Sequence, residues 1–180
     1  MPTIVAHALV AATAGAALRL PAKAVVAGAI AAMLPDLDVI GARYGVAWDS
    51  PLAHRGATHS LCAALFAGFA LAWMLFRAGA WRTPRWWGVA AFFAAAIASH
   101  GVLDAMTNGG SGVAFFWPFT GERYKFSWQP IEVSPFAWNF FSARGLRVMG
   151  SELAWIGIPC LVVLVAVTVK RIAARDAPRR

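Results

Sequence analysis

Five apolar runs separate the polar stretches of this chain, and they cover residues 4–18, 22–34, 60–76, 86–106 and 153–169. The last three approach the roughly 17–25 residues that a membrane-spanning helix needs. The first two are shorter, since thirteen helical residues rise only about 20 Å. Their many Ala and Gly residues suit close contact between helices. The pattern therefore predicts an all-α integral membrane bundle of about five apolar helices, with one domain over residues 1–180.

The composition supports a membrane protein. Hydrophobic residues make up 60% of the chain and charged residues 13%, whereas ordinary soluble domains are about 45–50% apolar and about 25% charged. The formal net charge is +8. In a membrane protein, an excess of positive charge indicates cytoplasmic loops more often than nucleic-acid binding. Membrane lipid is therefore the expected partner, and no nucleic acid is expected.

Basic residues form three clusters: Arg19 and Lys23 between the first two runs; Arg77, Arg82 and Arg85 between the third and fourth; and Lys170, Arg171, Arg175, Arg179 and Arg180 after the fifth. If all five runs span, these clusters fall on one side, which the positive-inside rule makes cytoplasmic. The N-terminus and the segments 35–59 and 107–152 then share the opposite side. In a bacterium this is the periplasmic face of the inner membrane.

Every His residue falls at the level of that opposite face, together with three Asp residues: His7, Asp36, Asp38, His54, His59, His100 and Asp104. The basic clusters alone set this topology, so the shared level is independent support for a site. Imidazole nitrogen and carboxylate oxygen together suit zinc, manganese or iron. We therefore expect these residues to bind one or two divalent ions, with zinc the first choice.

Each of these residues also has a simpler interpretation. The segment with His54 and His59 could be only a helix start with Thr58 or Ser60 as N-cap, although this does not explain the two His residues. His100 and Asp104 are four positions apart and share a helix face, where they could form a hydrogen-bonded pair without a metal. Ionisable groups inside an apolar run are costly and usually functional, which favours ligands. Asp36 and Asp38 could merely end a helix, although a carboxylate at a helix C-terminus opposes the macrodipole. His7 could be a helix-contact residue.

Basic and aromatic residues supply candidates for substrate binding. Arg55 follows His54, and its guanidinium suits a phosphate or carboxylate oxyanion. In the alternative, Arg55 pairs with a protein carboxylate such as Asp49 or a metal-ligating Asp. The aromatic and basic stretch 115–126 fits an interfacial belt at least as well as substrate contact, and its candidates are Trp117, Arg123 and Lys125.

The motifs PDLD, HRGATHS, HGVLD and FWPF followed by RYKF, in this order, resemble the YdjM-type membrane-bound metal-dependent hydrolases. The resemblance covers nearly the whole chain. That family is regarded as a distant relative of the zinc-dependent phospholipase C and P1 nuclease group, which is all-helical and holds a metal cluster with His and Asp. The resemblance implies metal roles for the seven His and Asp residues above. This chain has fewer His residues than the soluble phospholipases, so one or two metals are expected instead of three.

Together these features predict a membrane-bound metal-dependent hydrolase of a phosphoester, such as a phospholipid or a lipid-linked phosphate. A bound metal would lower the pKa of water and polarise the phosphoryl oxygen. Asp36 or Asp38 would serve as ligand or base, and Arg55 would hold the phosphate, with Arg123 and Lys125 as helpers. The alternatives are a non-enzymatic membrane regulator with a structural metal and an ion transporter. An open cavity beside the metal favours the enzyme.

Overall fold

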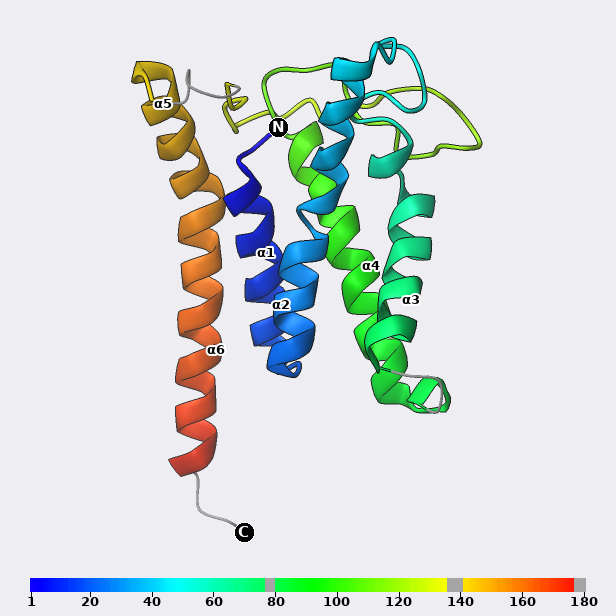
Figure 1. Cartoon of the computed structure of the whole chain (residues 1–180). Helices are drawn as coiled ribbons and strands as arrows, with labels where there is room; N and C mark the ends of the chain where they lie inside the picture. Colours follow the sequence, from blue (N-terminus) through cyan, green and yellow to red (C-terminus); the bar gives the residue numbers. More distant parts are fainter. Residues whose placement is uncertain (77–79, 136–140, 177–180) are drawn as a thin grey trace.

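The computed structural model describes residues 1–76, 80–135 and 141–176, and these residues form a bundle of helices with irregular polar connections (Figure 1). The main helices are α1 (Ile4–Ala17), α2 (Ala22–Ala31), α3 (Leu61–Phe76), α4 (Pro84–Ala105), α5 (Ala143–Glu152) and α6 (Ile158–Asp176). Shorter 3-10 helices are η1 (Leu34–Tyr44), η2 (Ala57–His59) and η3 (Ala80–Arg82), and a π-helical turn, η5 (Leu153–Gly157), joins α5 to α6. The predicted all-α bundle is confirmed.

Within the described residues, three helical stretches are long and apolar enough to cross a membrane: Ala22–Tyr44, Pro84–Ala105 and Ala143–Arg175. Two of them extend beyond the predicted runs. The second run continues as η1 to Tyr44, so the prediction of a loop beginning at residue 35 is wrong. The α-helical pattern ends at Ala31 and the chain continues as a 3-10 helix, because Pro35 lacks the N–H that would bond to the Ala31 carbonyl and favours a tighter turn. The last helix begins at Ala143 instead of 153.

Small residues let the helices approach closely. A Cβ atom at Gly68 of α3 would overlap the backbone of Ala94 in α4, and one at Gly28 of α2 would overlap the ring of Phe92. A Cβ atom at Gly15 of α1 would lie 2.9 Å from the same ring. Phe92 therefore fills a space that two neighbouring helices leave open. The Ala and Gly content of the first two runs has the packing role that the sequence predicts.

The polar connections gather at one end of the bundle, together with the N-terminus, while the α1–α2 turn, η3 and the end of α6 lie at the other (Figure 1). This arrangement confirms that the described members of the three basic clusters share one end; Arg77, Arg179 and Arg180 lie outside the described residues. At that end Lys23 Nζ donates to the carbonyl of Leu75 at 3.0 Å, and Arg171 donates to the carbonyl of Ala16 at 2.7 Å. Both cations thus meet the negative end of a helix dipole. The assignment of the two ends to the two sides of the membrane stays a prediction.

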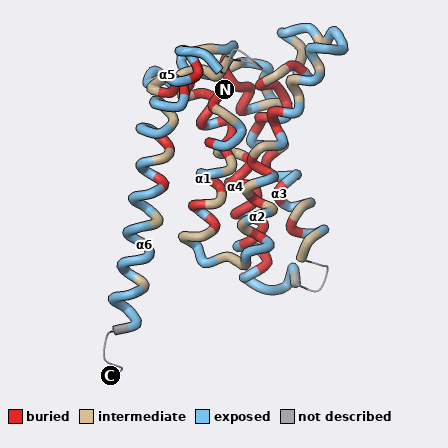
Figure 2. The backbone as a smooth tube through the Cα atoms, turned by 60° about the vertical axis from the view of Figure 1, so that its left-hand side comes forward, coloured by how far each residue is buried: buried red, intermediate tan, exposed pale blue. Residues whose placement is uncertain are grey.

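Burial is uneven across the bundle. Helix α4 is buried along much of its length, whereas α6 is exposed along most of its surface (Figure 2). Only 11% of the apolar window in Ala143–Arg175 is buried, against 67% in Pro84–Ala105. A long apolar helix with so little protein contact fits a lipid environment. Helix α4 is therefore the central element, and it carries the site to the polar end.

Candidate metal centre

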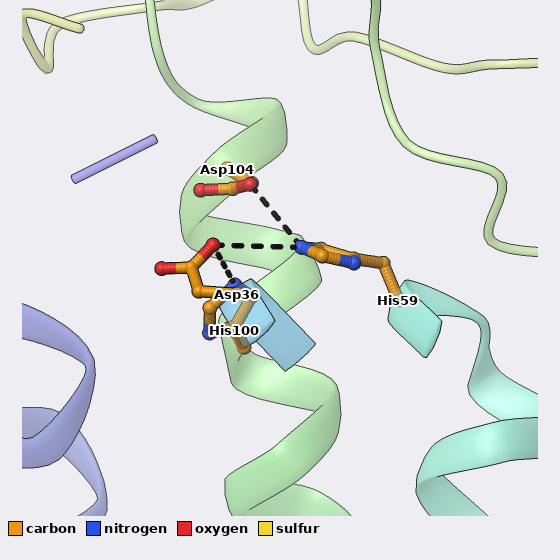
Figure 3. A group of neighbouring side chains, drawn as sticks. All are labelled: Asp36, His59, His100 and Asp104. Carbon is orange, nitrogen blue, oxygen red and sulfur yellow. Dashed lines mark hydrogen bonds and ion pairs between the residues drawn. The ribbon is translucent and has the colours of Figure 1, made fainter. Parts of the chain in front are cut away.

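Four buried side chains from three elements point toward one another at the polar end (Figure 3). Asp36 comes from η1, His59 from η2, and His100 and Asp104 from the last turns of α4. One ligand atom from each lies within 4.8 Å of all the others. The i, i+4 pair on α4 thus has the shared face that the sequence predicts, and two 3-10 helices bring the other members to it.

The distances between these atoms fit a metal shell. His59 Nε2 lies 3.6 Å from Asp104 Oδ2 and 3.9 Å from Asp36 Oδ1. His100 Nε2 lies 3.2 Å from Asp36 Oδ1. In a tetrahedral zinc site with bonds of about 2.0–2.2 Å, neighbouring ligand atoms lie about 3.3–3.6 Å apart. One ion between these side chains would need only small adjustments.

Several of these atoms have no hydrogen-bond partner among the described residues, although they are buried. They are His59 Nε2, Asp36 Oδ2 and both carboxylate oxygens of Asp104. A buried polar atom without a partner is costly, and a divalent cation between these side chains would offer a partner to His59 Nε2 and to the Asp104 carboxylate. Imidazole and carboxylate are also the donors that zinc, manganese and iron accept. The residues therefore fit a metal ion.

Outer contacts orient both imidazoles for this role. His100 Nδ1 lies 2.7 Å from the carbonyl oxygen of Ala32, which can only accept, so Nδ1 carries the hydrogen. His59 Nδ1 lies 3.1 Å from Asp38 Oδ2 and is fixed in the same way. In each neutral ring Nε2 then presents its lone pair to the cluster. Such contacts are typical of metal-ligating His residues.

Asp38 organises the segment that carries His59. Its Oδ1 lies 2.7 Å from His54 Nδ1, and its Oδ2 accepts hydrogen bonds from Thr58 Oγ1 at 2.5 Å and from the Arg55 amide at 3.3 Å. His54, Asp38 and His59 form a second group with metal-ligand spacing, joined to the first through the His59 ring. We interpret Asp38 and His54 as the outer layer of one centre. A second ion is the alternative.

The charges around His59 affect its proton. Burial lowers its pKa, but Asp104 and Asp38 raise it by more, so the pKa of His59 lies above its usual value. A proton therefore competes with a metal ion for Nε2 over a wider pH range than at an isolated imidazole.

His7 completes the set from α1. Its ring is fully buried and stacks on that of His100 with centroids 3.7 Å apart. His7 Nε2 lies 3.7 Å from Asp104 Oδ1, and neither ring nitrogen has a hydrogen-bond partner among the described residues. His7 thus fits a further ligand at the edge of the cluster. All seven predicted His and Asp residues lie together, and their metal binding stays a prediction.

Arg55 is buried, with 2% of its surface exposed. Its Nε lies 3.0 Å from Asp104 Oδ2, its Nη1 donates to the carbonyl of Gly109 at 2.9 Å, and its Nη2 donates to Thr107 Oγ1 at 3.0 Å. The Nε contact is an ion pair without hydrogen-bond geometry. The carboxylate beside Arg55 is thus that of Asp104, a candidate metal ligand. This agrees with the alternative in which Arg55 pairs with a metal-ligating Asp, and the exposed Asp49 is not the partner. A phosphate role for Arg55 stays a prediction.

The other predicted substrate residues lie farther out. Arg123 donates to the carbonyl of His54 at 2.9 Å and to Ser111 Oγ at 3.1 Å, so it connects two polar segments. Burial lowers the pKa of Arg123. Lys125 is exposed and Trp117 is half-buried. Substrate contact by these three residues stays a prediction.

A pocket of about 440 Å³ adjoins the centre. It is lined by Met1, Trp48, His54, Arg55, Gly110, Ser111, Val133, Ser134, Pro135 and Arg144. Arg144 is not among the predicted site residues, because the sequence predicts a loop over residues 107–152. The alternation of polar and apolar residues in ARGLRVMGSE is the signal of an amphipathic helix that could have located it. No comparable sequence pattern indicates Thr107 and Gly109, the residues that accept hydrogen bonds from Arg55.

The fold and the site define a helical membrane protein with a candidate centre of His and Asp at one membrane face. The model of the YdjM inner membrane protein family matches residues 1–177. The chain is 37% identical over 171 residues to the inner membrane protein YbcI of Escherichia coli (strain K12), covering 91% of this chain and 95% of that protein. The chain therefore belongs to the YdjM family of inner membrane proteins. No solved structure matches it.

Proposed function

We propose that this protein is a metal-dependent hydrolase that cleaves a phosphoester of a membrane lipid. The observation that supports this most is the combination of unpartnered, buried imidazole and carboxylate atoms with a cationic pocket beside them. Arg55 belongs to both, since it contacts Asp104 and lines the pocket. A periplasmic position of the site and a distant relation to the zinc-dependent phospholipases are parts of the same proposal.

Each group has a defined task in this proposal. Asp36, His59, His100 and Asp104 would hold the ion, which would be zinc, manganese or iron. A bound ion lowers the pKa of water and polarises a phosphoryl oxygen. Asp36 Oδ2, which has no hydrogen-bond partner among the described residues, is the better placed of the two candidate bases, because Asp38 is occupied by the His54–His59 segment.

Positive charge in the pocket would hold the phosphate. Arg144 is exposed, lines the pocket and pairs with no carboxylate among the described residues. A guanidinium with free donors suits a phosphate through two parallel hydrogen bonds. Arg144 is therefore the better placed arginine for direct contact, while Arg55 positions Asp104 and contributes its charge from below the pocket.

The apolar half of the bundle argues against a transporter. Below the centre the core consists of Ala24, Ala72, Trp86, Val89, Ala90, Phe92 and Phe93. An ion path needs polar or ionisable groups that continue through the membrane. Among the buried described residues away from the centre, the polar side chains are Thr13 and Trp86, and neither is ionisable.

A structural metal in a non-enzymatic regulator is the second candidate. The observation that favours it is the depth of the inner ligands, since His100 and Asp104 are fully buried and the pocket reaches His54 and Arg55 instead of them. A closed coordination shell is typical of structural sites. The two candidates predict the same metal content and different chemistry.

The experiment compares metal content with hydrolysis. Protein purified without chelator is analysed for bound metal and screened against phospholipids of different head groups in mixed micelles. We expect Arg144→Gln to retain the metal and to raise KM by about tenfold, the cost of one good charge-assisted contact. Arg147→Gln, on the same helix and outside the pocket lining, should match the wild type. Full metal content without hydrolysis of any lipid would support the structural metal.

A further inference from the structure

An apolar groove of about 660 Å³ lies between α1 and the segment formed by α5 and η5. Val5 and Leu9 line it from α1, and Met149 and Leu153 line it from the opposite wall. Val5 is 72% exposed and Leu153 62% exposed. Large apolar side chains on both walls, open at the side of a membrane protein, suit an apolar ligand.

The groove adjoins the cationic pocket. Met1, Ser134 and Pro135 line both cavities. Arg144 lies in the polar cavity and Leu153 in the apolar one, nine positions later on the same continuous helix. Nine helical residues rise about 14 Å. A ligand that spans both cavities therefore has an anionic group at one end and an extended apolar chain at the other.

The two walls are tied together at the junction. Glu152, the last residue of α5, accepts a hydrogen bond from the Thr3 amide and one of 2.6 Å from Thr3 Oγ1. Thr3 is also the residue that caps the N-terminus of α1. Below this contact Ile156 is buried in a cluster that includes Ala6. The groove is thus a defined part of the fold, between elements that are joined at two levels.

We infer that this groove holds an acyl chain of a phospholipid whose phosphate lies in the pocket of Arg144 and Arg55. This inference rests on the proposed function and names its substrate as a long-chain phospholipid. Because bilayer tails are as apolar as the groove, its surface adds little driving force. The phosphate supplies the selectivity, and the groove keeps the chain in apolar surroundings while the ester approaches the site.

Photocrosslinking tests the groove directly. The probes are a phosphatidylglycerol with a diazirine in one acyl chain and a diacylglycerol with the same chains, each added to the detergent-solubilised protein. Labels on α1 are located by mass spectrometry. We expect the phosphate-bearing probe to label α1 at least fivefold more, because only a lipid with a phosphate is retained by the arginines. Arg144→Gln should remove this preference.

A bulky residue on the opposite wall should block the groove. In Leu153→Trp, labelling of α1 by the phosphatidylglycerol probe should fall at least fivefold. Leu161→Trp is the matched control, because Leu161 is 60% exposed on α6 and lies outside the groove lining. Should Leu153→Trp unfold, Val5→Trp serves the same purpose, with the label then read on residues 149–157.

The outcomes separate this inference from the proposed function. Equal labelling by both probes, or labelling that Leu153→Trp and Val5→Trp leave unchanged, would overturn the acyl-chain site. If Leu153→Trp removed both the labelling and the cleavage of long-chain phospholipid while a dihexanoyl analogue was still cleaved, the inference would be supported. Phosphate-dependent labelling without cleavage would retain the lipid site and refute the hydrolase.

Discussion

Asp38 Oδ2 lies 3.1 Å from His59 Nδ1, and this contact determines which nitrogen of the ring faces the cluster. Thr58 Oγ1 lies 3.0 Å from the same nitrogen, so the hydrogen on Nδ1 is held between this hydroxyl and the carboxylate, and Nε2 is left directed at Asp36 and Asp104. Asp38 also accepts from the hydroxyl of Thr58, the neighbour of His59. One carboxylate therefore fixes both the ring and the backbone that carries it.

Asp38→Asn should weaken metal binding without removing it. The amide keeps the size of the side chain but loses the negative charge and one acceptor, so His59 is oriented less firmly. Changes to such outer contacts typically cost 10–100-fold in metal affinity. Competition with a chromogenic chelator measures this affinity. Unchanged affinity would show that Asp38 organises the loop alone, and complete loss would place Asp38 among the direct ligands.

His100→Ala and Asp104→Ala should each lower the metal content itself. Every lost ligand leaves an incomplete shell around the ion, and both residues come from the central helix α4. Elemental analysis of the purified variants gives the metal per chain. Asp49→Ala is the control, because Asp49 is an exposed carboxylate outside both candidate groups. If both α4 variants retained full occupancy, these two residues would not be ligands.

The sequence predicted the members of the site because the membrane restricts where ionisable residues can lie. Once the basic clusters oriented the runs, all seven His and Asp residues fell at one level. The sequence pattern could not show which of these residues face the cluster and which support it from outside. Asp36 and Asp38 are two positions apart and look equivalent, yet Asp36 faces His100 at 3.2 Å while Asp38 holds His54 and His59 from outside.

The polar connections were less predictable than the helices. The partners of Arg55 are a backbone carbonyl and a hydroxyl, which no periodicity reveals. The helix over residues 143–152 was not predicted, because its polar and apolar residues are mixed and do not form the continuous apolar run of a membrane span. The groove depends on how α5 packs beside α1, and this is a tertiary relationship. The sequence therefore identifies the metal-ligand candidates, while the groove proposed for an acyl chain depends on the fold.

Cysteine labelling can test the orientation. In a background with Cys62→Ala and Cys160→Ala, Gly121→Cys lies at the polar end and Ala173→Cys near the end of α6. Both positions are exposed. Because the basic clusters favour the cytoplasm, we expect an impermeant maleimide to label Gly121→Cys in intact cells, and Ala173→Cys only after permeabilisation. The reverse pattern would place the candidate centre on the cytoplasmic face.

Gly110→Ala should disturb the centre through Arg55. Gly110 has φ of +88°, and a Cβ atom there would overlap Nη1 of Arg55. A non-glycine residue in such a conformation costs about 1–3 kcal/mol. The displaced guanidinium would also lose contact with Asp104 and Gly109. We therefore expect a lower thermal midpoint and weaker metal binding, measured on the same preparation by differential scanning fluorimetry and chelator competition.

Gly121→Ala provides the matched control for this change. A Cβ atom at Gly121 meets no atom within 4 Å, so the substitution should leave both the thermal midpoint and the metal affinity unchanged. Arg55→Lys tests the contact between Gly110 and Arg55 by changing Arg55 instead. It keeps the positive charge, but one ammonium group cannot replace a guanidinium directed at Asp104, Thr107 and Gly109. We expect Arg55→Lys and Gly110→Ala to weaken metal binding to a similar extent, and their double variant to be little worse than either one. Additive losses would mean that Gly110 acts on the centre independently of Arg55.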